Sequence, residues 1–288
     1  MKIKRALIVY KKSSYETHVI SGRDPHYLRL LREGSVATRG SKRIHQEHVA
    51  TFHQIKRVLS QLRIRHDLRL RYHLGKIRGY DLVITIGGDG TFLETTHFLE
   101  EGVLMGVNSA PMESVGFFCR TDRRNFGQKI AALMGGRQRL QKLSRLRLIL
   151  PGRKRIPFAL NDILFANRNP AATTRYLLKV GNKGEEQKSS GLWVAPAAGS
   201  TAAIHSAGGR ALPLSSGQIQ YRVREPYHPG RRRYRLLRGV LPGGEKVKIV
   251  SLMDEAAVYL DGPHLCYPIR RGDSVTIEQS GHPVYAVW

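Results

Sequence analysis

Five consecutive residues, Gly87 to Thr91 (GGDGT), form the segment best suited to chemistry. They follow an apolar, β-branched run at 81–86 that predicts a buried strand, and they precede a run at 91–101 that predicts a helix. Glycine lets the backbone approach a ligand closely and adopt positive φ, and N–H groups at a helix start attract anions. Asp89 is unfavourable inside such an anion cradle unless it binds a metal or takes a proton, which indicates a reactive group. The alternative is a tight turn with Asp89 as the N-cap.

A polar pair, Asn161 and Asp162, interrupts the apolar segment FALNDILFA at 158–166. Buried polar groups need hydrogen-bond partners. One interpretation is that both side chains face a hydroxyl-rich ligand, and the other is a β-turn or bulge. The two residues alone leave both interpretations open.

A third segment, GLWVAPAAGSTAAIHSAGG at 191–209, begins as a short strand and enters a run of small residues after Pro196. Its GSTA stretch, residues 199–202, is typical of a loop that opens a helix and offers hydroxyls and free N–H groups to a phosphate or ribose. The alternative is a packing site for small residues.

Other motifs offer less. The chain contains no G-x-x-x-x-G-K-[ST] and no G-x-G-x-x-G, and its 12 histidines show no metal-ligand spacing with Cys119 and Cys266. Cys119 lies in an apolar stretch and is expected to be buried. The basic run at 231–235 could contact phosphates or nucleic acid, but we interpret it as a solvated loop. The Asp-Gly-Pro stretch at 261–263 predicts a turn.

The elements that must position these residues change character near residue 140. Before residue 140, strands and helices alternate, which predicts an α/β domain with an open parallel sheet. The strands are expected at 3–10, 63–70, 81–86 and 103–107, and the helices at 44–62, 91–101 and 122–134. The polar, basic stretch 11–43 is expected to be a loop. After residue 140, short alternating runs separated by Gly and Pro turns predict an all-β sandwich. We therefore expect domains at 1–140 and 141–288, with the last strand allowed to return to the first.

The chain has 288 residues, of which 41% are hydrophobic, and no window approaches the ~20 apolar residues of a membrane span. We expect a cytoplasmic protein. The formal net charge is +26, and residues 1–80 hold 19 of the 48 bases but only 5 of the 22 acids. Such a charge implies polyanionic partners: nucleic acid, an anionic membrane surface or phosphorylated ligands.

The combination of GGDGT, Asn161-Asp162 about 70 residues later, and GSTA followed by SAGG resembles the NAD kinase family, in order and spacing, from residue 81 to about 265. GGDGT alone is shared with lipid kinases, and a related GGDG occurs in phosphofructokinases. Several longer stretches resemble the NADH-preferring branch described in plants: LNDILFANRNPAATTR, SSGLWVAPAAGSTAAIHSAGG, IQYRVREP and GVNSAPMESVGFFC.

This resemblance implies an N-terminal α/β domain and a C-terminal β-sandwich with the site between them. It also implies phosphoryl transfer from ATP to the 2′-hydroxyl of the adenosine ribose of NAD(H), with Asp89 as the proton acceptor. The resemblance assigns the remaining nucleotide-binding positions as follows: Gly87, Gly88, Gly90 and Thr91 to the ATP phosphates with Mg²⁺ or another divalent cation, Asn161 and Asp162 to ribose hydroxyls, and Gly199, Ser200, Thr201, Ala202, Ala203 and Ser206 to the dinucleotide pocket. No residue is assigned as a direct metal ligand.

Three departures from the family pattern lie where the dinucleotide would bind. Ala203 stands where many members have Tyr, Ser190 where many have Asp, and the usual N-x-G-x-L-G-F is spread over Asn108 to Phe117 with two extra residues. Loss of a carboxylate at Ser190 removes an anion that would favour the cationic nicotinamide ring. We expect relaxed or NADH-leaning selectivity.

Two other functions stay open on the sequence: a lipid or small-molecule kinase built on GGDGT, and a basic nucleic-acid-binding protein. The first is not expected to carry Asn-Asp and GSTA in register, and the second predicts aromatics on a basic face, which we do not find. The family resemblance implies a homodimer or homotetramer, and we expect no specific nucleic acid and no membrane as partners. It leaves open whether ATP or polyphosphate is the donor.

Overall fold

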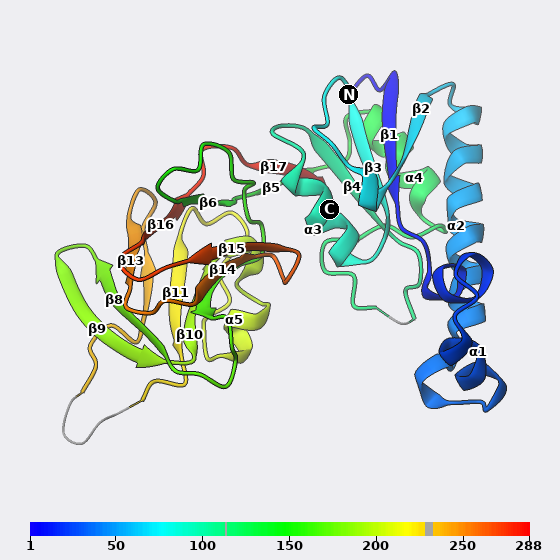
Figure 1. Cartoon of the computed structure of the whole chain (residues 1–288). Helices are drawn as coiled ribbons and strands as arrows, with labels where there is room; N and C mark the ends of the chain where they lie inside the picture. The colour runs from blue at the N-terminus through cyan, green and yellow to red at the C-terminus, as the bar shows by residue number, and fades with distance from the viewer. Residues whose placement is uncertain (113, 228–232) are drawn as a thin grey trace. The chain divides into compact units, whose positions relative to one another are not determined.

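The computed structural model describes residues 1–112, 114–227 and 233–288 (Figure 1). Two compact units make up the chain. The first contains Met1–Gln141 together with Tyr285–Trp288, and the second contains Lys142–Val284. Arg231 and Arg232, part of the basic run singled out in the sequence, lie outside the described residues.

The first unit is built on a six-stranded sheet in the order β2-β1-β3-β4-β17-β5. Strand β1 pairs in parallel with β2 and β3, and β4 pairs in parallel with β3 and β17. The strands are β1 (Arg5–Tyr10), β2 (Arg65–Leu70), β3 (Leu82–Gly87), β4 (Val103–Asn108), β5 (Leu140–Leu143) and β17 (Val284–Val287). The sheet therefore takes its strands from both ends of the chain.

Helices cover both faces of this sheet because its central strands are apolar on both sides. Every residue of β3 is buried. One face packs with Ile55 of α2 (Ser41–Gln61) and Phe126 of α4 (Phe126–Met134) in a single hydrophobic cluster. Helix α3 (Asp89–His97) packs against β1, β3 and β4. Near-continuous apolar strands are typical of a doubly covered parallel sheet, and the predicted α/β domain with an open parallel sheet is confirmed.

The stretch 11–43 corrects the sequence-based expectation of a loop, because it is largely helical. It contains two short helices, η1 (Glu16–Ser21) and η2 (Val36–Thr38), and helix α1 (Pro25–Arg32). Asp24 caps α1 by accepting from the backbone N–H groups of His26 and Tyr27, at 3.0 and 3.3 Å. Proline in the first turn suits a helix, because its missing N–H would be unpaired there in any case. Asp24 followed by Pro25 is thus a sequence signal for a helix start, although the segment around it is polar.

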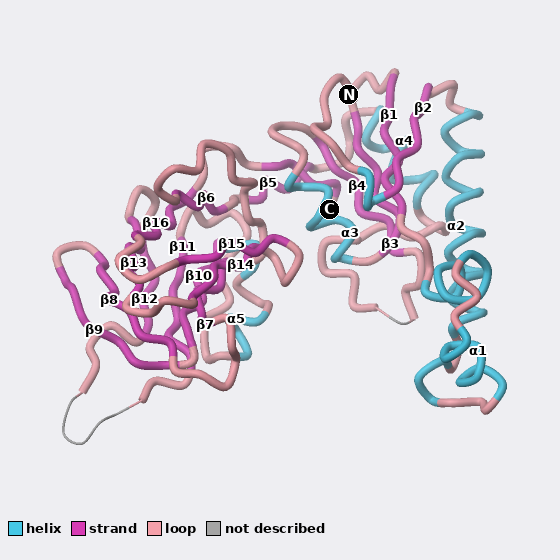
Figure 2. Tube along the Cα trace, viewed as in Figure 1, coloured by secondary structure: helices cyan, strands magenta, loops and turns pink. Residues whose placement is uncertain are grey.

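The second unit is an antiparallel sandwich of two sheets, with strand orders β12-β11-β10-β7-β14-β15 and β6-β16-β13-β8-β9. Figure 2 shows strands and loops throughout it, with the one-turn helix α5 (Ala203–Ser206) among its described residues. The two sheets enclose one core, in which Phe165 and Tyr176 meet edge to face at 5.5 Å. The strands are β6 (Leu146–Ile149), β7 (Ile163–Asn167), β8 (Thr174–Val180), β9 (Lys183–Ser189), β10 (Gly191–Pro196), β11 (Ile219–Arg224), β12 (Arg238–Leu241), β13 (Lys246–Ser251), β14 (Ala256–Leu260), β15 (Leu265–Ile269) and β16 (Ser274–Gln279).

The predicted all-β sandwich is confirmed, with differences in detail. Strand β7 begins at Ile163, so the polar pair at 161–162 precedes the strand instead of interrupting it. Strand β9 has a polar sequence, KGEEQKS, and the sequence pattern did not predict it. It forms because all seven of its residues pair with β8. None of the helices in the described ranges is both long and apolar enough to cross a membrane.

Candidate active site

The GGDGT segment lies where β3 ends and α3 begins, at the carboxyl edge of the parallel sheet. Open α/β sheets bind ligands at this edge. Gly87 has to be glycine because a Cβ there would lie 2.5 Å from Thr91 Oγ1. None of the three glycines of the segment, Gly87, Gly88 and Gly90, has a positive φ. Close packing, and not a left-handed backbone, explains the glycine at position 87.

Asp89 is the first residue of α3, and the N-cap alternative is wrong because Gly88 occupies the cap position. The Asp89 carboxylate instead accepts three backbone N–H groups, from Phe117 and Phe118 at 2.8 Å each and from Cys119 at 3.2 Å. A carboxylate offers about four lone-pair sites. The backbone of this loop therefore occupies three of these sites.

Aromatic packing supports the loop that donates to Asp89. Phe118 stacks on Phe92 of α3 with ring centroids 5.4 Å apart, and Phe117 meets Trp288 edge to face at 5.8 Å. The carbonyl of Trp288 accepts from Gln138 Nε2 at 2.8 Å. These contacts fix the three donors, and with them the direction of the carboxylate.

In the loop that departs from the family spacing, Asn108 to Phe117, the side chain of Asn108 contacts described residues on both sides of position 113. That side chain donates to the carbonyl of Ser114 at 3.3 Å and accepts from Ala110 N and Ser114 Oγ, both at 3.1 Å. Gly116 has φ +65°, and a Cβ there would lie 2.6 Å from Asn108 Nδ2. Asn108 thus links the described residues on both sides of position 113.

Cys119 is buried, as expected, and is not available as a nucleophile. Burial, together with the nearby Asp89 carboxylate, raises the pKa of its thiol. The neutral thiol is inert at physiological pH.

Lys11 is a candidate site residue that the sequence analysis missed. It follows the end of β1, and its Cδ lies 3.6 Å from the position that a Cβ on Gly87 would take. Burial and the nearby Arg71 lower the pKa of Lys11. Its amino group forms no ion pair within the described part of the chain. A half-buried cation without an acid is costly, and an anion bound at the glycine segment would offset that cost.

His48 of α2 forms hydrogen bonds to two segments at this edge of the sheet. Its Nε2 donates to the carbonyl of Lys11 at 2.8 Å, which leaves Nδ1 to accept from Ser109 Oγ, also at 2.8 Å. Ser109 N in turn donates to the carbonyl of Gly87 at 3.0 Å. Burial lowers the pKa of His48 to about 4, so the ring is neutral at physiological pH. His48 therefore links α2, β1 and the glycine segment without adding charge.

A polar cluster in the second unit brings together the other two sequence motifs. A Cβ on Gly199 would lie only 1.5 Å from the backbone carbonyl oxygen of Asn161, so the GSTA loop packs directly on the Asn-Asp pair. Asn161 Nδ2 donates to Asp162 Oδ2 at 2.9 Å. The two motifs, about 40 residues apart in sequence, thus form one surface.

Asp261 shapes this surface, although the sequence predicted only a turn there. Its carboxylate accepts the backbone N–H groups of Leu160, Asn161 and Asp162 at 2.9, 2.7 and 3.0 Å. Burial and the charge of Asp261 raise the pKa of Asp162 to about 7. Near neutral pH, Asp162 therefore exists as a mixture of acid and carboxylate, able to donate or accept a hydrogen bond.

The remaining predicted residues divide into structural and outward-facing positions. Ser200 is fully buried; its hydroxyl donates to the carbonyl of Ala197 and accepts from Leu212 N, both at 2.8 Å. That hydroxyl stabilises the loop instead of facing a ligand. Thr201, Ala203 and Ser206 are exposed. The predicted site residues thus form two groups, one in each unit.

No family model matches the chain. Among curated proteins, the chain is 38% identical over 233 residues to a probable NADH kinase of Oryza sativa subsp. japonica, covering 73% of this chain and 71% of the relative. It is 35% identical over 235 residues to the NADH kinase of Arabidopsis thaliana, covering 74% of each.

Among solved structures, an Archaeoglobus fulgidus NAD kinase in complex with ATP matches with a TM-score of 0.70 at 21% identity, over 99% of this chain and 93% of that one. Yeast NADH kinase complexed with NADH matches with a TM-score of 0.70 at 16% identity, over 100% and 84%. Both structures thus share the fold of this chain, a parallel α/β unit followed by a β-sandwich. With the sequence identities above, the chain belongs to the NAD kinase family.

Proposed function

We propose that this member of the NAD kinase family transfers the γ-phosphoryl group of ATP to the 2′-hydroxyl of the adenosine ribose of NAD⁺ or NADH. The observation that carries the proposal is Asp89, a carboxylate fixed by three backbone N–H groups at the start of a helix. Such a group can accept the hydroxyl proton while the cradle around it binds phosphate. Family membership favours this reaction over a lipid kinase or a nucleic-acid-binding protein.

In the first unit, the glycine segment and Lys11 would bind the ATP phosphates. The backbone N–H groups at the start of α3 supply the neutral donors, and Lys11 supplies a charge. Thr91 Oγ1 is buried without a hydrogen-bond partner in the described ranges, which marks an unused polar group beside Gly87. These groups neutralise and orient the phosphates, which is most of what phosphoryl transfer requires.

We propose that Mg²⁺ enters with ATP as part of the substrate. The described residues contain no cluster of three or more His, Cys, Asp or Glu side chains able to hold a metal. Magnesium usually binds through substrate phosphates, water and one or two carboxylates, so a site without a protein cage fits an ion that the nucleotide carries.

In the second unit, Asn161 and Asp162 would bind ribose hydroxyls, and Thr201, Ala202, Ala203 and Ser206 would border the dinucleotide. We propose an NADH-leaning selectivity. Ser190 and Ala203 replace the acid and the aromatic ring common in the family, and two relatives above 30% identity are named NADH kinases. Without a carboxylate at position 190, the cationic nicotinamide ring of NAD⁺ gains no electrostatic advantage over the neutral ring of NADH.

An activity matrix tests the proposal: purified protein with NAD⁺ or NADH as acceptor and with ATP or polyphosphate as donor, in the presence of Mg²⁺. We expect NADP(H) formation, a higher kcat/KM for NADH, and a loss of at least about 100-fold in kcat for Asp89→Asn. Glu33→Gln is the control, because it removes an exposed carboxylate of the same unit and leaves the base in place. Wild-type turnover by Asp89→Asn would show that Asp89 is not the base. A strong preference for NAD⁺ would overturn the proposed preference for NADH. The homodimer or homotetramer implied by the family is checked by light scattering on the same preparation.

A further inference from the structure

A basic cavity in the sandwich unit is lined by none of the residues assigned above. It has a volume of about 350 Å³ and lies between the SAGG turn and strands β11 and β12. Ligand pockets span roughly 300–1,000 Å³, so this one suits a small molecule. Its lining consists of Gly208, Gly209, Arg210, Gln220, Tyr221, Arg238, Gly239 and Val240.

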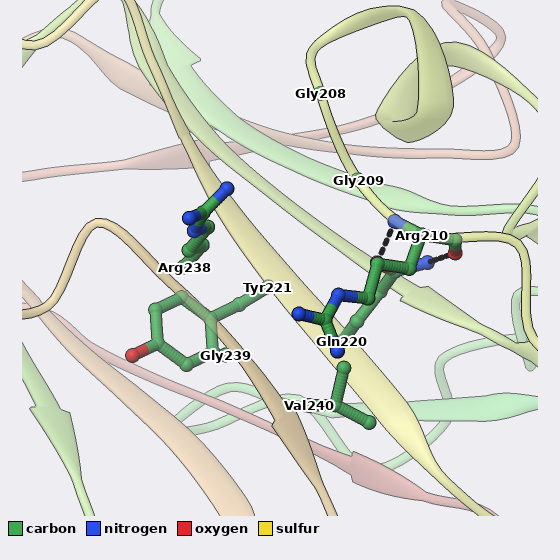
Figure 3. A pocket seen from close by; sticks show the side chains of 8 residues that line it. All are labelled: Gly208, Gly209, Arg210, Gln220, Tyr221, Arg238, Gly239 and Val240. Carbon is green, nitrogen blue, oxygen red and sulfur yellow. Dashed lines mark hydrogen bonds between the residues drawn. The ribbon is translucent and has the colours of Figure 1, made fainter.

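Two guanidinium groups define the charge of this cavity. Figure 3 shows the side chains of Arg210, which directly follows the SAGG stretch at 206–209, and of Arg238, the first residue of β12, among those that line the cavity, together with Tyr221 and Val240. Neither guanidinium forms an ion pair with another residue in the described ranges. Glu185, whose charge acts on Tyr221, is already engaged by the backbone N–H groups of Arg235 and Leu236. The positive charge of the cavity is therefore not compensated internally.

The backbone that carries Arg210 is held rigidly. The buried side chain of Gln220 accepts from Arg210 N at 3.0 Å and donates to Arg210 O at 2.7 Å, as the dashed lines in Figure 3 mark. A Cβ on Gly209 would lie 3.0 Å from Gln220 Oε1, so the glycine lets this clamp form. Fixed donors lose less entropy on binding than flexible ones.

The wall opposite Arg210 is shaped by a second close contact. A Cβ on Gly239 would lie 2.5 Å from the ring of Tyr221, so any larger residue would displace the ring. In register, Tyr221 pairs with Gly239, and Gln220 pairs with Val240. Val240 adds an apolar surface next to the two cations. The cavity thus combines two charges with a small apolar wall.

We propose that this cavity is a second anion-binding site, which takes a small phosphate monoester between Arg210 and Arg238. Guanidinium groups bind phosphate through paired N–H donors, and the Val240 wall accommodates a short organic group. The site uses none of the residues assigned to the kinase reaction, so the proposal does not depend on that reaction.

Calorimetric titration of ribose 5-phosphate, inorganic phosphate and uncharged ribose tests the proposal. The proteins compared are wild type, the double variant Arg210→Gln/Arg238→Gln, and Lys154→Gln/Arg155→Gln. The last removes two charges from an exposed loop of the same unit, so it controls for the general positive field. Kinase activity without added ligand and the thermal midpoint are measured in parallel, and Arg238→Gln alone provides a milder change.

We expect wild type and the control to bind ribose 5-phosphate with the same affinity and to bind ribose undetectably. The cavity double variant should bind ribose 5-phosphate at least tenfold more weakly, with kinase kcat/KM within twofold of wild type. Binding of inorganic phosphate as tight as ribose 5-phosphate would show that the organic group contributes nothing and would overturn the monoester assignment. Equal losses in the cavity variant and the control would overturn the site altogether.

Discussion

Lys11 illustrates how one side chain acquires a role from its surroundings. We expect Lys11→Ala to raise the KM for ATP about tenfold or more, because an ionic hydrogen bond contributes about 1.5–3 kcal/mol. Lys12→Ala is the matched control, since it removes the same charge one residue away, where the side chain contacts Ser21. Steady-state kinetics over ATP concentration measures both variants. Equal effects at the two positions would mean that only net charge matters.

Asp162 gives a second prediction at the residue scale, in the pH dependence of stability. Its raised pKa, about 7 against an ordinary value of 3.8, means that the native state keeps a proton that the unfolded chain has lost. The stability contributed by this group therefore falls as pH rises from 3.8 to about 7. We expect Asp162→Asn to gain thermal midpoint relative to wild type from pH 5 to 7 and to keep a constant gain above it.

The matched control for Asp162 is Asp254→Asn. Asp254 is exposed, and its bond to Arg271 lowers its pKa, so its contribution does not change between pH 5 and 8. Thermal unfolding of the three proteins at pH 5, 6, 7 and 8 measures the difference. A flat difference for Asp162→Asn would show that the buried acid is ionised throughout.

At the scale of elements, Gly199 tests whether the GSTA loop and the Asn-Asp pair form one surface. Alanine at this position would place a Cβ 1.5 Å from the backbone carbonyl oxygen of Asn161, and backbone cannot move aside as a flexible side chain can. We expect a loss of about 3 kcal/mol, which corresponds to roughly 6–12 °C in thermal midpoint. Gly281→Ala is the control, since nothing lies within 4 Å of its Cβ position. Equal midpoints for the two variants would contradict the close contact.

The elements also show what a sequence can and cannot predict. Strands β3 and β4 and helix α2 were predictable because their apolar periodicity is local. Strand β9 was not, because its polar residues pair only once β8 is in place. Asp261 lies about 100 residues from the backbone N–H groups that donate to it, so no local sequence pattern predicts this contact. Lys11 could have been found, since it follows a predicted strand whose carboxyl end lies at the ligand-binding edge.

The whole molecule carries a net charge of +26, far more than a nucleotide site needs. A positive field accelerates the arrival of anionic substrates, and salt screens it, with a Debye length near 10 Å at 0.1 M. We expect kcat/KM for ATP to fall several-fold between 50 and 300 mM KCl, while kcat at saturating substrates stays constant. Kinetics at fixed free Mg²⁺ measures both. A kcat/KM for ATP that does not change with salt would show that the positive charge does not accelerate the arrival of ATP.

Fold class was predictable at this scale because the change from helix–strand alternation to strands alone is visible in the sequence. The order of the strands within each sheet was not predictable, because it depends on contacts between distant segments. Strand β17, from residues 284–287, lies between β4 and β5 in the first sheet.

This placement has a consequence for synthesis. The ribosome makes β17 and Trp288 after the other five strands of the first sheet, so this sheet has an open position between β4 and β5 until they have been synthesised. The loop that holds Asp89 also lacks its packing partner until then, because Phe117 rests against Trp288. Removal of residues 284–288 would therefore leave the reactive carboxylate poorly fixed.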